Sequence, residues 1–222
     1  PLPELTVQLN VWHTEFEGLI TTSTLNREFE AEARGETNYV VRCTATDQCQ
    51  EGTVNYVSLT SNNYKGVTME GIDFDINYVM DTDNMGRFDM GVNAAKITKY
   101  IYQRFASDSV ESNEGEMGLP DTRMTPYLTW GKGDWGVGLT GYHVSGQETD
   151  YFGTPYSVDD SMTFNLRVSY QLPWDASVSL GAINVTDEEP EQNSDWYGWE
   201  PFDFSLYDTR GRTVYITYEQ SL

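Results

Sequence analysis

Two histidines and a pair of neighbouring aspartates are the side chains whose types and spacing could support catalysis or metal binding. His13 and His143 lie far apart, and neither has a cysteine or a carboxylate at ligand spacing. Asp73 and Asp75 are two residues apart, so on a strand both carboxylates share one face, as in general acid–base sites. The sequence contains no HExxH, GxSxG or P-loop pattern. We therefore predict that the protein is not an enzyme and holds neither a metal nor a cofactor.

The segment 81–86 resembles a calcium-binding loop but fails at two positions. Met85 occupies a ligand position, and Val92 stands where the closing glutamate would be. A tight turn explains this segment better. The pair Asp73 and Asp75 is likewise better explained as polar groups that line the lumen of a barrel.

The most informative pattern is a strict alternation of apolar and polar residues. In the segment 71–80, Ile72, Phe74 and Ile76 fall on one face, whereas Asp73 and Asp75 fall on the other. Such a period of two predicts a strand with one apolar and one polar face. The same pattern recurs at seven further places, which together with 71–80 gives eight predicted strands. The seven further strands are 5–11, 88–94, 124–130, 135–139, 162–172, 178–182 and 214–218.

The alternation that begins after Gly86 loses its phase beyond Ala94. Lys96 then takes the apolar position, and Ile97 takes the polar one. A β-bulge near Ala94 and Ala95 would restore the facing. A strand that leaves the membrane at this point would also explain the change.

Short and long connections between the predicted strands alternate along the chain. The short ones are 81–86, 131–134 and 173–176, and the long ones run roughly over 21–64, 106–120, 148–159 and 187–207. Short turns at one end and long loops at the other are the layout of an outer-membrane barrel. Aromatic rings near the short turns or the C-terminus indicate a membrane-interface girdle: Tyr78, Trp130, Trp135, Tyr170, Trp174 and Tyr218.

Composition is compatible with this layout and excludes other classes of protein. The net charge of −22 argues against nucleic-acid binding, which needs a basic surface. An aromatic content of 14% argues against disorder. No apolar run approaches the roughly 18 residues of a membrane helix. Cys43 and Cys49 are six residues apart in a polar stretch, which predicts a disulfide and an oxidising compartment, with two free thiols as the alternative.

Three segments resemble the barrel of TonB-dependent outer-membrane receptors. They are the strand 70–78, the segment 183–190, which is similar to the family's Asn-Leu-Phe-Asp-x-x-Pro segment, and 207–212, which is similar to its Tyr-Asp-x-Arg-Gly-Arg ending. They occur in the family's order over nearly the whole chain. Two features depart from the pattern: Val185 and Thr186 replace the usual Leu-Phe, and the chain closes on Leu222 rather than an aromatic residue.

The resemblance implies an all-β, antiparallel transmembrane barrel segment with short periplasmic turns and long extracellular loops. Barrels of this family have 22 strands and a plugged lumen. Residues 1–222 would then be the C-terminal part, without the plug and the earlier strands. The expected location is the outer membrane of a Gram-negative bacterium, in contact with its lipid. The expected role is uptake of a siderophore, a cobalamin-like cofactor or an oligosaccharide, with the TonB protein engaged only through the missing plug.

Two other hypotheses remain open at the level of sequence. One is a self-contained eight-stranded outer-membrane barrel with a structural or adhesion role, in which strand 5–11 would pair with strand 213–218. The other is a soluble β-sandwich that binds carbohydrate.

Aromatic side chains in the last two long loops are the candidate ligand-binding residues, because exposed rings stack on sugar rings and other apolar ligand faces. The alternative is that they pack the loops together or form an outer girdle. The loops are also acidic, which favours a neutral oligosaccharide or a cationic complex, although the acidity could equally reflect a saline habitat. The candidates are Tyr151, Phe152, Tyr156, Trp196, Tyr197, Trp199 and Phe202.

Overall fold

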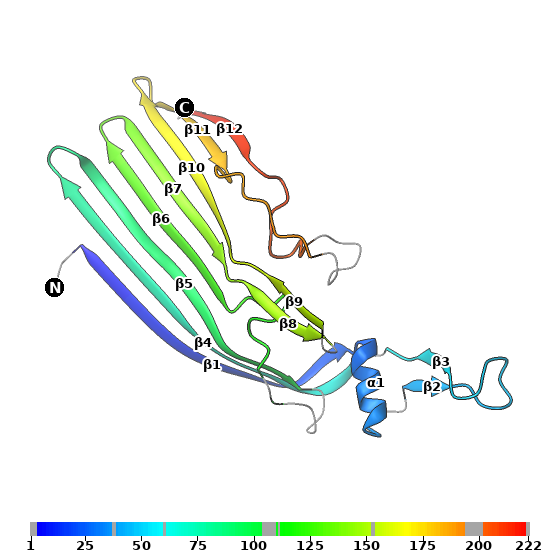
Figure 1. Ribbon diagram of the computed structural model, residues 1–222. Helices are drawn as coiled ribbons and strands as arrows, with labels where there is room; N and C mark the ends of the chain where they lie inside the picture. The colour runs from blue at the N-terminus through cyan, green and yellow to red at the C-terminus, as the bar shows by residue number, and fades with distance from the viewer. Residues whose placement is uncertain are drawn as a thin grey trace. The chain divides into compact units, whose positions relative to one another are not determined.

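A computed structural model describes residues 4–36, 39–59, 61–103, 110, 112–151, 154–193 and 202–220. Its main element is an antiparallel eight-stranded sheet in the order β1-β4-β5-β6-β7-β10-β11-β12 (Figure 1). Each of the eight predicted strands lies within one of these strands, so that prediction is confirmed. Their bounds are β1 (Leu5–Thr22), β4 (Ser61–Thr82), β5 (Gly86–Gln103), β6 (Thr122–Lys132), β7 (Trp135–Val144), β10 (Ser161–Leu172), β11 (Ala176–Ile183) and β12 (Thr213–Gln220).

Five shorter elements lie in the long connections, where alternation predicted only loops. They are α1 (Leu25–Ala33), β2 (Val40–Arg42), β3 (Val54–Val57), β8 (Gln147–Tyr151) and β9 (Thr154–Val158). β2 pairs with β3, and β8 pairs with β9, each as an antiparallel hairpin. Within the described ranges, no helix is both long enough and apolar enough to cross a membrane.

The contacts divide the chain into two compact units. The sheet unit comprises Pro1–Thr14, Met69–Tyr100 and Ser112–Leu222, and the insert unit comprises Glu15–Thr68 and Ile101–Glu111. All interactions in the site below lie within the sheet unit.

The strand register places apolar residues opposite apolar residues on one face, which we call the apolar face. Several of its side chains are open to the surroundings: Ile216 is 75% exposed and Leu180 is 58% exposed. A water-soluble sheet would bury such a face against a second layer. One row of cross-strand neighbours shows the continuity of the face: Met90, Leu128, Leu139, Leu166, Ala182 and Val214.

The opposite face, the polar face, carries a hydrogen-bonded network. Asn77 donates from Nδ2 to Asp89 Oδ1 at 2.5 Å and to the Tyr127 hydroxyl at 2.7 Å. Asp73 accepts a hydrogen bond from Trp12 Nε1 at 3.2 Å, and Arg167 donates to Ser179 Oγ at 2.8 Å. Asp73 is therefore one of several hydrogen-bonded polar groups on this face. The row next to that of Leu166 consists of Asp89, Thr129, Gly138, Arg167, Gly181 and Tyr215.

Aromatic rings on the polar face lie over glycines of neighbouring strands. A Cβ atom added at Gly181 would lie 2.2 Å from a ring carbon of Tyr215, and one added at Gly71 would lie 2.3 Å from a ring carbon of Trp12. At Gly91 it would lie 2.9 Å from a ring carbon of Tyr127. A ring that covers a strand glycine packs the space left by the missing side chain. These glycines are therefore required for close packing.

The short connections gather at one end of the sheet (Figure 1). The six predicted aromatic residues lie within a few residues of these turns or of the C-terminus. Trp135 and Tyr170 face each other across β7 and β10 with ring centroids 4.8 Å apart. Trp130 donates from Nε1 to the Met85 carbonyl at 2.6 Å, and Trp174 donates from Nε1 to the Tyr218 hydroxyl at 3.3 Å. Rings with a polar edge and an apolar body suit a membrane–water boundary.

The pairing of β5 with β6 tests the first explanation for the lost phase, a β-bulge. The register runs without a shift from Arg87 opposite Gly131 to Lys96 opposite Thr122. A bulge against β6 at Ala94 and Ala95 is therefore excluded. The pairing of β5 with β6 ends at Lys96, whereas β5 itself continues to Gln103.

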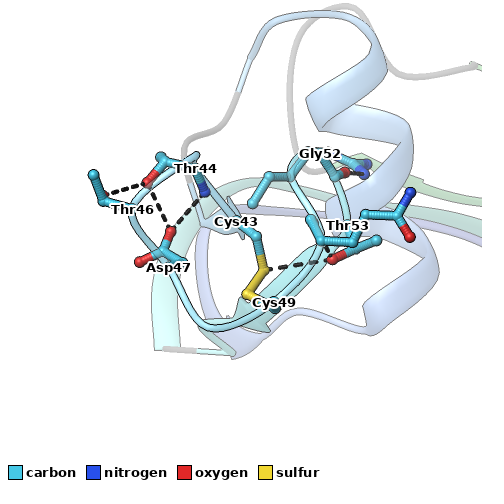
Figure 2. The surroundings of a disulfide bond; sticks show 9 residues. Cys43, Thr44, Thr46, Asp47, Cys49, Gly52 and Thr53 are labelled. Carbon is cyan, nitrogen blue, oxygen red and sulfur yellow. Dashed lines mark hydrogen bonds between the residues drawn. A yellow bond between two sulfur atoms is a disulfide. The ribbon is translucent and has the colours of Figure 1, made fainter.

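The predicted disulfide is present in the insert unit, where it closes the turn between β2 and β3 (Figure 2). The Cα atoms of Cys43 and Cys49 are 6.0 Å apart. Thr44 donates from its backbone N–H to Asp47 Oδ2 at 2.6 Å inside the turn. Arg42 binds both carboxylate oxygens of Glu32 at 2.7 Å, which ties the hairpin to α1.

β1 and β12 stand at opposite ends of the sheet order. A self-contained eight-stranded barrel would require these two strands to be neighbours. In the part of the chain that the structure describes, no such pairing occurs.

Candidate functional site

Three long connections meet at the end of the sheet opposite the short turns, and Gln147 joins them. Gln147 lies in β8 and is only 3% exposed. Its Oε1 accepts a hydrogen bond from the Gly118 backbone N–H at 2.7 Å, in the connection between β5 and β6. Its Nε2 donates to the Tyr207 hydroxyl at 3.1 Å, in the connection between β11 and β12. One buried amide therefore fixes three segments that are distant in sequence.

Further hydrogen bonds hold the same connections together. The Glu148 N–H donates to the Gly115 carbonyl at 2.9 Å, and Asn193 Nδ2 donates to the Ser157 carbonyl at 2.9 Å. The Asp159 N–H donates to Glu191 Oε2. The loop end is thus an organised surface, as expected where a rigid scaffold presents binding residues.

A cavity of about 940 Å³ opens between these connections. This volume lies near the top of the roughly 300–1,000 Å³ range of ligand pockets. Its wall is acidic, and among its described lining residues no lysine or arginine occurs. Six of those residues carry carboxylates: Glu114, Glu116, Asp121, Glu148, Asp159 and Asp160. We call this feature the acidic cavity.

Two of these carboxylates have basic partners beside the cavity. Asp121 Oδ2 lies 2.9 Å from Lys96 Nζ, and Asp160 Oδ2 lies 3.3 Å from His143 Nε2. The Gly146 backbone N–H, 2.6 Å from Asp160 Oδ1, and then His143 lower the pKa of Asp160. At Asp121, burial raises the pKa, but the hydrogen bonds from Lys96, Ser145 and Thr122 together lower it by more. Both carboxylates therefore stay ionised at neutral pH.

The remaining carboxylates of the cavity lack basic partners among the described residues. Glu114 Oε2 is shielded from solvent and accepts no hydrogen bond from any described group. The Glu116 carboxylate accepts a hydrogen bond only from Asn113 Nδ2, which lies 2.8 Å from Glu116 Oε1. The wall therefore carries a net negative charge, which attracts cations and repels anions.

Neither histidine belongs to a metal-binding group in the described residues. His13 Nδ1 lies 3.3 Å from Glu70 Oε1, and His143 pairs with Asp160 alone. The sequence spacing did not indicate these partners, because each comes from another strand or connection.

Of the predicted aromatic residues, Tyr156 and Phe202 have side chains that the structure describes, and these two do not line a common cavity. Tyr156 lies in β9 and is partly exposed. Phe202 packs against Phe204 with ring centroids 4.7 Å apart, and lines a separate cavity of about 310 Å³ with Pro190 and Arg210 among other residues. The backbone of Tyr151 ends β8. Four candidates lie outside the described residues, namely Phe152, Trp196, Tyr197 and Trp199.

The residues that sequence analysis missed are those joined by long-range contacts. Gln147 has no distinctive neighbourhood in sequence. Glu114 lies in the predicted long connection 106–120 and Asp121 follows it directly, but the sequence pattern singles out neither residue. The one available signal was the excess of acidic residues, which did not show which of them share a cavity.

Two segments that carry the family resemblance bind each other. Arg212 donates from its backbone N–H to Asp187 Oδ1 at 2.8 Å and from its guanidinium to Asp187 Oδ2 at 3.2 Å and the Val185 carbonyl at 3.3 Å. Asn184, which is 7% exposed, accepts the Glu188 N–H and donates to the Glu188 carbonyl. This clamp fixes the two ends of the last long connection.

Asp208 and Arg210 form an exposed ion pair, which leads to a prediction about the titration of Asp208. Hydrogen bonds from the Arg210 guanidinium, at 2.6–3.1 Å, lower the pKa of Asp208 to about 2. Because the folded pKa is depressed, the pair's contribution to stability is present above the ordinary pKa of 3.8 and is lost as pH falls toward 2. We expect Arg210→Gln to move the pKa of Asp208 back toward 3.8, measured by the NMR shift of its carboxyl carbon. An Asp208 that already titrates near 3.8 with Arg210 in place would contradict the geometry.

Several solved receptor structures resemble this chain, whereas no curated protein matches its sequence. A mutant of the ferric enterobactin receptor PfeA of Pseudomonas aeruginosa superposes with a TM-score of 0.60 at 15% identity, over 98% of this chain and 29% of the receptor. The siderophore receptor PirA of Acinetobacter baumannii gives 0.63 at 13% identity, over 98% and 30%. The copper transporter OprC gives 0.57 at 13% identity, over 98% and 28%.

These likenesses concern the fold, and the chain spans about three tenths of the length of each of those proteins. The sequence itself supplies the family. The family model described as "TonB dependent receptor-like, beta-barrel" matches residues 3–185. Because that match covers well over half of the sequence, the chain belongs to the TonB-dependent receptor family and forms part of its β-barrel.

Proposed function

We propose that this chain is the C-terminal wall of an outer-membrane receptor of a Gram-negative bacterium, which takes up a scarce nutrient through its lumen. In this proposal the plug and the earlier strands belong to other parts of the receptor, and the TonB protein acts through the plug. The supporting observation is the two-faced register, with a continuous apolar face and a hydrogen-bonded polar face over the sheet. Family membership and receptor-like solved structures agree with it.

The ligand enters, on this proposal, at the end formed by the long connections. The acidic cavity supports entry of neutral or cationic ligands, because its unpaired carboxylates repel anions. Candidate nutrients are a siderophore, a cobalamin-like cofactor or an oligosaccharide.

Thiol labelling on intact cells tests location, orientation and charge together. The described residues contain no free cysteine, so a single cysteine reports its own position. Ser157→Cys places the thiol in the wall of the acidic cavity, and Asp134→Cys places it in a short turn. We expect Ser157→Cys to react on intact cells, with a cationic methanethiosulfonate roughly tenfold faster than with an anionic one. Asp134→Cys should react only after the outer membrane is permeabilised.

A variant with Glu148→Gln and Asp159→Asn should reduce the difference between the two reagents, and so should high salt. Asp175→Asn, at the opposite end of the sheet, is the matched control and should leave the ratio unchanged. Labelling of Ser157→Cys only in permeabilised cells would contradict the proposed location. Equal rates for both reagents would contradict the charge assignment.

A further inference from the structure

A second cavity lies on the polar face, beneath the connection between β11 and β12. Its volume is about 350 Å³. Its floor is formed by residues of polar-face register at the long-connection ends of three strands: Tyr142 and Val144 of β7, Ser161, Thr163 and Asn165 of β10, and Ile183 of β11. Leu206, Tyr207, Asp208, Arg210 and Gly211 form the cover. We call this feature the covered cavity.

The cover is anchored on both sides. Arg212 binds Asp187 next to Gly211, and Tyr207 accepts the hydrogen bond of the buried Gln147. Burial raises the pKa of the Tyr207 hydroxyl, so it stays protonated at neutral pH. Because fixed segments close the cavity, its shape is set before any ligand arrives, which is the usual state of small-molecule sites.

The lining combines apolar surface with unused hydroxyl groups. Tyr142 is 46% exposed, and together with Val144, Ile183 and Leu206 it supplies apolar area. The hydroxyls of Tyr142, Ser161 and Thr163 have no hydrogen-bond partner among the described residues. They are therefore available to a ligand.

The lining is electrically balanced, in contrast to the acidic cavity. Its only charged side chains among the described lining residues are Asp208 and Arg210, which bind each other at 2.6 Å. A charged ligand thus finds no unpaired counter-charge here. This balance favours a neutral ligand that carries both an apolar face and several hydroxyl groups.

A row of neutral polar groups runs along β10 through Ser161, Thr163 and Asn165. Alternate residues of a strand are roughly 7 Å apart, so the row extends roughly 14 Å. A pyranose ring has an apolar C–H face, which stacks on an aromatic ring, and a rim of hydroxyls, which bind side chains of this kind. The length of the row exceeds one such ring.

We propose that the covered cavity binds a neutral carbohydrate of about two sugar rings, with Tyr142 as its stacking surface and Thr163 and Ser161 as its hydroxyl partners. This inference rests on the proposed receptor function and names the ligand class for one site within it. It assigns the site to the barrel wall itself.

Binding of neutral disaccharides to the purified natural protein tests the assignment. The probes are maltose, cellobiose, lactose, mannobiose and xylobiose, with digalacturonate as the anionic comparison and catechol as the aromatic one, all measured by isothermal titration calorimetry. At least one neutral disaccharide should bind, and digalacturonate should bind more weakly. Binding of none of the five, or of catechol alone, would overturn the proposal.

Matched variants locate the binding. Tyr142→Ala should lower the affinity for the disaccharide roughly tenfold, whereas Tyr142→Phe should lower the affinity only about threefold, because the ring remains. Thr163→Val should lower the affinity roughly threefold to tenfold through loss of one hydroxyl. Thr140→Val removes a hydroxyl from the same face, opposite Asn165 but outside the cavity, and should have no effect. If neither Tyr142→Ala nor Thr163→Val changed the affinity, the assignment of binding to the covered cavity would be overturned.

Failure of this experiment is distinguishable from failure of the receptor proposal. Thiol labelling at Ser157→Cys and Asp134→Cys reports membrane location and orientation without any ligand. A protein that passes the labelling test and binds no disaccharide remains a receptor, but one whose covered cavity does not bind sugar.

Discussion

Replacing Leu166 by arginine should destabilise the protein by roughly 2–4 kcal/mol in lipid bilayers, the cost of a charged side chain at the midplane of a barrel's lipid face. Leu166 lies in β10 with Leu139 and Ala182 as its cross-strand neighbours, in an unbroken apolar row. An arginine there would place its guanidinium in hydrocarbon with no acidic side chain in that row. The free energy of unfolding in liposomes, from urea titration, measures the effect.

Thr129→Arg is the matched control. Thr129 belongs to the neighbouring row on the polar face, which contains Asp89 and Arg167, so its depth along the strands is similar. Its side chain is exposed on that face, where a cation can remain hydrated. We expect a loss well below that of Leu166→Arg. Equal losses for the two variants would mean that the faces are not solvated differently.

Gly91→Ala should cost about 3 kcal/mol, because overpacking against backbone cannot relax by a change of rotamer. An added Cβ atom would lie 2.2 Å from the Ile76 carbonyl oxygen and 2.8 Å from the Tyr127 hydroxyl. That hydroxyl is also the acceptor of Asn77. The substitution therefore forces apart β4, β5 and the ring that bridges them.

Gly138→Ala provides the comparison on the same face of the sheet. A Cβ atom at Gly138 would meet nothing closer than Thr129 Cγ2 at 4.0 Å. Its unfolding free energy should stay close to that of the natural protein. If Gly91→Ala were equally mild, the close approach of Tyr127 to Gly91 would be wrong.

The eight strands and their facing were predictable because alternation is a local signal. In the segment 162–172, each residue's face follows from its parity alone, and the register of β10 with β7 and β11 confirms the facing. The short turns were equally clear, since Asp83, Gly133 and Pro173 belong to residue types that favour turns. The sequence likewise indicated the disulfide through the close spacing of Cys43 and Cys49, which the structure confirms.

The elements inside the long connections were missed for a physical reason. α1 is nine residues long, too short to show a sustained helical period, and its Glu32 is held by Arg42 from a separate hairpin. The hairpin of β8 and β9 has five residues in each strand and includes Pro155, which weakens a strand pattern. Such short elements depend on tertiary contacts more than on local preference.

The candidate site was only partly predictable. The acidity of the loops was visible, but the grouping of Glu114, Asp121 and Asp160 around one cavity depends on contacts between connections. Tyr142 was not singled out, because its polar-face position matters only when the last connection lies over it. The loop aromatics Tyr156 and Phe202, which composition did suggest, line no common cavity among those the structure describes.

Collision accessibility along β10 tests most directly that one face of this sheet meets hydrocarbon and the other a water-filled lumen. Single cysteines at 162–169 would carry a nitroxide label in the natural protein, reconstituted in lipid, and be probed with oxygen and with a soluble nickel chelate. We predict a period of two, with oxygen favoured at Met162, Phe164, Leu166 and Val168, and nickel favoured at Thr163, Asn165, Arg167 and Ser169. Low accessibility to both reagents at Phe164 and Leu166, as between two layers of a soluble protein, would contradict the account.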